Sequence, residues 1–118
     1  MKQIIPTRVA EILYAFVMIA FGALHLRYGS SGMGVPSYMP GDPSIWMYVT
    51  GVAFAAAGIA ILINKFKRVA CYLLALMLLV FILTIHLMPA IKVHNFYQPL
   101  KDAGLALAAI MIGNNASK

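Results

Sequence analysis

Charged residues are scarce in this sequence, and acidic residues are the scarcest. Only 10% of the 118 residues are charged, with nine Lys and Arg against three Asp and Glu. A soluble globular domain has about 25% charged residues and roughly 45–50% apolar ones, whereas this chain is 63% hydrophobic. The composition excludes a soluble fold and predicts an integral membrane protein of one domain.

Cysteine is nearly absent as well. The single Cys71 excludes a disulfide within the chain and a Cys-x-x-Cys redox pair. The formal net charge of +6 would favour a nucleic-acid ligand in a soluble protein. Here the basic residues flank apolar segments, so we expect them to set topology and contact lipid headgroups, with the bilayer and not nucleic acid as partner. No small-residue cleavage site follows the first apolar segment, so we expect that segment to remain as a helix.

Four apolar segments predict an all-α fold, an antiparallel bundle of four transmembrane helices in a single domain, residues 1–118. Each of the first three has about the 20 residues that cross a hydrocarbon core of roughly 30 Å. The fourth is shorter, so Lys101 and Asp102 must lie in its first turn and the lysine must snorkel. We expect helices at about residues 7–27, 44–64, 68–88 and 99–115, with an outward-facing loop at Met88–Gln98.

The distribution of Lys and Arg predicts the orientation. Six lie on the side of the two termini and three on the opposite side. Three of the six fall in the short segment Asn64–Arg68, between the second and third helices. By the positive-inside rule both termini are cytoplasmic.

Small residues recur at helical spacing on two predicted helices. The second helix has Gly51, Ala55 and Gly58, and the fourth has a similar stripe that ends at Gly113. Small residues let membrane helices approach closely and gain van der Waals contact. The stripes therefore favour a compact bundle, and they would equally permit contact with a second copy or another membrane protein.

Most polar side chains of the predicted helices lie at one membrane depth, on the side opposite the termini. We predict a ligand-binding site there, formed by His25, Trp46, Tyr48, His86, Lys101 and Asp102. Either His25 or His86 can donate to Asp102, which would fix the histidine tautomer and favour its charged form. Such a pair can bind a carbonyl or pass protons to it. The alternative is that these residues only anchor helix ends at the membrane interface.

Glu11 is a secondary candidate at the opposite depth, because an ionisable group within a span is costly and is a functional hypothesis by default. Its alternative role is an interfacial carboxylate that pairs with Arg8, three residues earlier, near the positive end of the helix dipole. About 21 Å of helix separate Glu11 from His25, so the two cannot touch.

An ordered set of short motifs resembles the DoxX-like family of small four-helix membrane proteins. The motifs are FGALHL at 21–26, PxxxPxxP at 36–43, WxYxTG at 46–51, AAAG at 55–58, IHLMP at 85–89 and LKDAGLAL at 100–107. The resemblance covers nearly the whole chain. It implies a four-helix bundle in the bacterial inner (plasma) membrane with both termini inside.

The resemblance implies several functions, because relatives include a small subunit of a thiosulfate:quinone oxidoreductase and eukaryotic assembly chaperones. We expect an accessory or partner subunit of a redox-linked membrane complex, bound to another membrane protein or a second copy. The alternative is a quinone- or lipid-binding oxidoreductase component with its polar site at the outer helix ends. A small transporter or assembly chaperone is the second alternative. Quinone is the candidate cofactor, a haem between His25 and His86 is disfavoured, and neither a metal site nor a catalytic residue is assigned.

Overall fold

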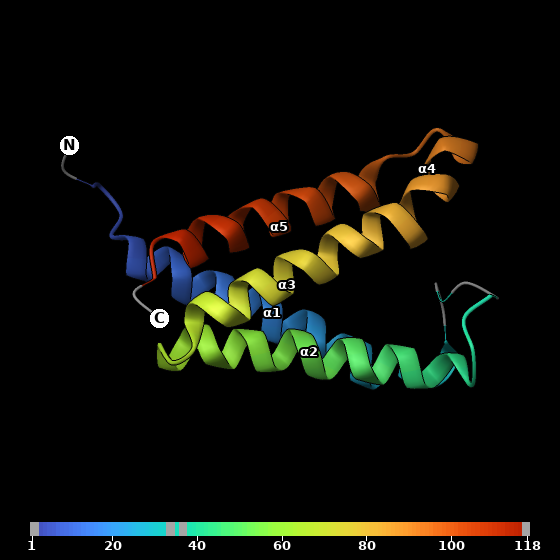
Figure 1. Cartoon of the computed structure of the whole chain (residues 1–118), viewed down its shortest axis with the longest axis horizontal. Helices are drawn as coiled ribbons and strands as arrows, with labels where there is room; N and C mark the ends of the chain where they lie inside the picture. Colours follow the sequence, from blue (N-terminus) through green and yellow to red (C-terminus); the bar gives the residue numbers. More distant parts are fainter. Residues whose placement is uncertain (1–2, 33–34, 36–37, 117–118) are drawn as a thin grey trace.

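The computed structural model describes residues 3–32, 35 and 38–116, and for residues 85, 86 and 88–90 it describes the backbone alone. Within these residues every regular element is helical. In chain order they are α1 (Thr7–Arg27), the 3₁₀ turn η1 (Gly29–Ser31), α2 (Pro43–Ile63), α3 (Lys67–Phe81), the π-helical turn η2 (Ile82–His86), α4 (Leu87–Val93) and α5 (Tyr97–Asn114). The long helices run side by side along a molecule 47 Å in length (Figure 1).

Three of the four main helices are long and apolar enough to cross a membrane. They are Thr7–Arg27, Pro43–Ile63 and Lys67–Thr84, the last of which includes part of η2. Most of each of these helices is exposed, including many large apolar side chains. α5 is outside this group, since Tyr97, Gln98, Lys101 and Asp102 make its first turns polar. The chain is therefore an all-α protein with four main helices, and its three apolar helices indicate a membrane location.

Both chain termini and the α2–α3 connector, residues 64–66, lie at the same end of the bundle (Figure 1). We call this the terminal end. The loop between α1 and α2 and the segment around α4 lie at the opposite end, which we call the loop end. Since successive long helices alternate in direction, Glu11 and His25 occupy opposite ends, as their spacing requires.

The bundle consists of two tight helix pairs, α1 with α2 and α3 with α5. A Cβ built on Gly22 would lie 2.7 Å from the carbonyl oxygen of Gly51, and one on Gly58 would lie 2.8 Å from that of Ala15. The backbones of α1 and α2 therefore touch, an approach that only glycine permits. Both predicted small-residue stripes are buried within these pairs, so the expectation that they could also serve a second copy or a partner is wrong.

Apolar side chains fill the space where the two pairs meet. Met18, Ile61, Cys71 and Leu78 are the largest completely buried residues. Cys71 is a free thiol in this core, where it packs as a small apolar side chain. Tyr14 adds a polar link, because its hydroxyl donates to the carbonyl oxygen of Leu105 on α5 at 2.6 Å.

Local sequence explains how α2 begins and ends. Asp42 caps its N-terminus by accepting from the backbone N–H of Ser44 at 3.0 Å, and Pro43 occupies the first helical position. Two hydrogen bonds from Ser44 lower the pKa of Asp42, and the one from its backbone N–H has a larger effect than the one from its hydroxyl. At the other end, Asn64 and Phe66 adopt left-handed backbone angles (φ 59° and 55°) that reverse the chain into α3.

The loop expected at Met88–Gln98 is largely helical, which corrects the sequence-based prediction. The third helix continues through η2 into α4 and ends at Val93, so only residues 94–96 separate it from α5. Pro89 is the third residue of α4. Proline inside a helix lacks the N–H that would donate to the preceding turn, and Pro89 comes shortly after the π-helical turn, where the helical bonding register changes.

Candidate functional site

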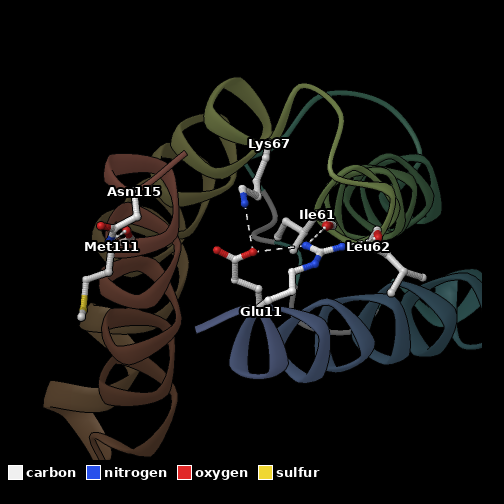
Figure 2. Close-up of polar contacts among 7 residues, drawn as sticks. Glu11, Ile61, Leu62, Lys67, Met111 and Asn115 are labelled. Atoms are coloured by element: carbon white, nitrogen blue, oxygen red, sulfur yellow. Dashed lines mark hydrogen bonds and ion pairs between the residues drawn. The ribbon is translucent and has the colours of Figure 1, made fainter. Parts of the chain in front are cut away.

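A cluster of charged side chains closes the terminal end of the bundle (Figure 2). Glu11 on α1 is only 4% exposed. Its Oε1 atom lies 2.9 Å from Nζ of Lys67 on α3 and 3.2 Å from Nη1 of Arg8 on α1. The carboxylate is thus neutralised by cations from two helices, as a buried charge requires.

Arg8 also completes the C-terminus of α2. Its Nη1 and Nη2 atoms donate to the carbonyl oxygens of Ile61 at 2.8 Å and Leu62 at 2.6 Å. These carbonyls belong to the last turn of a helix, which carries partial negative charge; that of Ile61 also accepts from the backbone N–H of Asn64 at 3.2 Å. Arg8, Glu11 and Lys67 therefore join α1, α2 and α3 at the terminal end.

Sequence reasoning found the Arg8–Glu11 pair but missed Lys67. Two features of the sequence indicated a second partner for Glu11. A buried acid needs more than one partly exposed cation, and the segment Asn64–Arg68 reaches the same membrane depth. The rotation of α3 about its axis, which decides whether Lys67 or Arg68 faces Glu11, is set by packing. In the structure Arg68 instead donates to the carbonyl oxygen of Ala116, near the C-terminus.

At the loop end, two aromatic rings connect three of the predicted site residues. His25 lies edge-on to Phe54 with ring centroids 5.2 Å apart, and Phe54 lies 6.1 Å from Phe21. The ammonium group of Lys101 lies 5.1 Å from the centroid of Phe21. The Oδ1 atom of Asp102 lies 4.0 Å from Nζ of Lys101, and Asp102 is 3% exposed. The structure thus gathers His25, Lys101 and Asp102 in one neighbourhood between α1, α2 and α5.

Their polar atoms have partners close by in the chain. Nδ1 of His25 lies 2.7 Å from the carbonyl oxygen of Phe21, one turn earlier. Lys101 donates to the side chain of Gln98 at 2.7 Å. These are the contacts expected of interfacial residues.

Trp46 and Tyr48 make their described contacts with the loop between α1 and α2. The indole N–H of Trp46 donates to the carbonyl oxygen of Pro40, at 2.8 Å. The Tyr48 ring covers Gly29, where a Cβ would lie only 2.4 Å from the ring. His86 ends the π-helical turn η2, but its side chain lies outside the described residues. Trp46 and Tyr48 therefore hold the loop between α1 and α2.

No set of three His, Cys, Asp or Glu side chains in the described part of the chain could hold a metal ion. Every buried side-chain nitrogen or oxygen described has a hydrogen-bond partner. Two candidate sites remain. They are the polar neighbourhood at the loop end and the charged cluster at the terminal end, and residues from at least three helices or helix ends form each of them.

The chain belongs to the family described as Domain of unknown function (DUF8561), whose model matches residues 14–113. The matched region covers all of α2 and α3, the greater part of α1 and nearly all of α5. The comparisons with curated proteins and with solved structures gave no match.

Proposed function

We propose that this DUF8561 protein is a four-span membrane protein, a single domain over residues 1–118, that serves as an accessory subunit of a membrane complex. In this proposal α5 is the fourth span. A helix of 18 residues is about 27 Å long at 1.5 Å per residue, close to a hydrocarbon core of roughly 30 Å. Lys101 would snorkel toward the loop-end surface, and Asp102 is already buried in the bundle.

The single observation that carries the proposal is the exposed face of α5. Leu100, Gly104, Leu107 and Met111 recur at four- and three-residue steps along it, and all are exposed. We call this surface the α5 face. A Cβ built on Gly104 would meet nothing within 4 Å, so no contact within the chain requires glycine there. Glycine inside a helix costs about 1 kcal/mol relative to alanine.

An exposed glycine in an apolar stripe is suited to the close approach of another helix. α5 packs mainly on α3, which leaves the opposite side of α5 for a partner. The other small-residue stripes are used within the chain, and the glycines at positions 22, 51, 58 and 113 all meet neighbouring helices. The α5 face is thus the surface best suited to a second protein, which is another subunit or a second copy.

Photocrosslinking tests this proposal with a matched control. A photoreactive amino acid would replace Leu107 on the α5 face or Leu13 on α1, since each is 60% exposed. We expect position 107 to give a defined protein adduct in native membranes, while position 13 gives lipid adducts. Adduct mass separates another subunit from a second copy. Lipid adducts alone at both positions would contradict the proposal.

The resemblance to DoxX-like proteins supports a redox-linked complex in the bacterial inner membrane. The concentration of Arg8, Lys65, Lys67 and Arg68 at the terminal end supports cytoplasmic termini by the positive-inside rule. In such a complex this chain would supply position and stability, and electrons would come from the partner or a ligand.

A quinone- or lipid-headgroup site at the loop end is the second candidate, favoured by the placement of His25, Lys101 and Asp102 around the Phe21–Phe54 pair. Protein purified in mild detergent would then retain a quinone, identifiable by mass spectrometry. His25→Ala should release it, as should His86→Ala if that side chain contributes, while Trp46→Phe leaves retention unchanged. Preparations that contain only bulk phospholipid would argue against this candidate.

A further inference from the structure

An apolar groove of about 340 Å³ runs between α2 and α3 on the surface of the molecule. Small alanines of α2, such as Ala53 and Ala56, form one wall, and Val69, Leu73 and Met77 of α3 form the other. Phe66, in the connector, marks its terminal end. The groove differs from the sites described above in position and in lining.

The length of the groove along α3 matches the thickness of one bilayer leaflet. From Phe66 to Met77 the chain advances about 16 Å along α3 at 1.5 Å per residue. A hydrocarbon core of roughly 30 Å has leaflets of about half that thickness. The groove therefore covers the depth that one acyl chain occupies below its headgroup, and the alanines leave space beside α2 for it.

The positive charge at the terminal end of the groove favours an anionic headgroup. Lys65, Lys67 and Arg68 surround Phe66 in sequence, and the first turn of α3 contains no acid. The positive end of the helix dipole lies at the N-terminus of α3. It repels these cations and would stabilise an anion placed beside them. Glu11 is the one acid in the neighbouring charged cluster, and it already pairs with Lys67 and Arg8 (Figure 2). The described residues of this end thus carry an excess of positive charge.

We propose that the groove binds an acyl chain of an anionic phospholipid whose phosphate contacts the basic residues beside Phe66. Lys65 is the principal headgroup contact, because it is exposed and the two basic residues that follow it have structural roles. Lys67 pairs with Glu11, and Arg68 donates to the carbonyl oxygen of Ala116. Phe66 is 72% exposed at the mouth of the groove, a position where an aromatic ring suits the membrane interface.

Native mass spectrometry of the full-length protein would test the headgroup preference. Dioleoyl phosphatidylglycerol and dioleoyl phosphatidylcholine serve as probes that share acyl chains and differ in charge. We expect phosphatidylglycerol to bind more tightly. Lys65→Gln should weaken its binding roughly fivefold, as expected for one basic residue near a membrane surface, and leave phosphatidylcholine binding unchanged. Lys92→Gln removes an exposed lysine at the loop end and is the matched control.

Filling the groove tests the acyl-chain contact. Ala56→Phe should weaken the binding of both lipids, while Val52→Phe, at an exposed position of α2 outside the lining, should weaken neither. A photoreactive residue at position 56 should yield lipid adducts in membranes. Equal affinity for the two lipids in the wild-type protein would overturn the proposal. So would unchanged binding in Ala56→Phe, or an adduct of position 56 with a second copy or another protein.

Discussion

Replacing Glu11 with Gln should destabilise the bundle strongly, because it leaves a largely buried cation without its partner. Lys67 would lose its partner at 2.9 Å while its side chain is only 12% exposed. Breaking a buried ion pair by removing one partner costs about 3–5 kcal/mol, because the other charge remains buried. Arg8 loses less, since it is 39% exposed and keeps its two carbonyl acceptors on α2. We therefore expect a loss of about 3 kcal/mol, near the lower end of this range.

The double variant Glu11→Met/Lys67→Met separates loss of the pair from burial of an unpaired charge. Apolar residues that replace a buried ion pair are often neutral or stabilising, so the double variant should recover most of the stability lost in Glu11→Gln. Lys65→Met is the control, because Lys65 is an exposed lysine of the same connector and surface exchanges usually change stability by less than about 0.5 kcal/mol.

Equilibrium unfolding of the full-length protein in mixed micelles would measure these free energies. The reasoning fails if Glu11→Gln unfolds within about 0.5 kcal/mol of the wild type. It also fails if the double variant is as unstable as the single one, because the cost would then lie in packing and not in the unpaired cation.

Three further predictions address packing and pH. Gly22→Ala should lower the free energy of unfolding by about 1–3 kcal/mol, because the added methyl group overpacks against α2. Gly104→Ala, with open space around it, should raise the free energy of unfolding by up to about 1 kcal/mol. Thermal unfolding of both variants tests these opposite signs. Tyr14→Phe removes the hydrogen bond to Leu105 and should lower the free energy of unfolding by about 1 kcal/mol, and an unchanged value would remove that bond from the account. The folded-state pKa of Asp42 lies below its ordinary 3.8, so its capping contribution is complete above that value and is lost as the pH falls through the folded-state pKa. Asp42→Asn keeps a good cap and should reduce the loss of stability on acidification; an identical acid profile in the two proteins would contradict this role.

Hydrophobic pattern and length were enough to predict the four main helices. The first helix was expected at residues 7–27 and α1 spans Thr7–Arg27, because long apolar segments bounded by proline and basic residues leave few alternatives. The continuation of the third helix into α4 was missed. The sequence pattern gave no signal of the π-helical turn Ile82–His86, through which the helix continues past its expected end at residue 88.

The depth of the polar residues was predictable, but their rotation about each helix axis was not. Spacing along the chain placed His25 and Asp102 near the same end of the bundle. Which side chains meet depends on the angles at which helices pack, and so Trp46 and Tyr48 face the loop instead of the histidine. For the same reason the pairing of Glu11 with Lys67 became visible only in the folded chain.

The central claim is that all four long helices cross the membrane, and the side on which each loop is accessible tests it most directly. In a Cys71→Ala background, single cysteines would replace Ser30, Lys65, Asn95 or Asn115 and be labelled with a membrane-impermeant thiol reagent in sealed vesicles of both orientations. The account predicts that positions 30 and 95 label from one side and positions 65 and 115 from the other. Labelling of position 115 from the same side as position 95 would show that α5 does not cross, and would contradict the account.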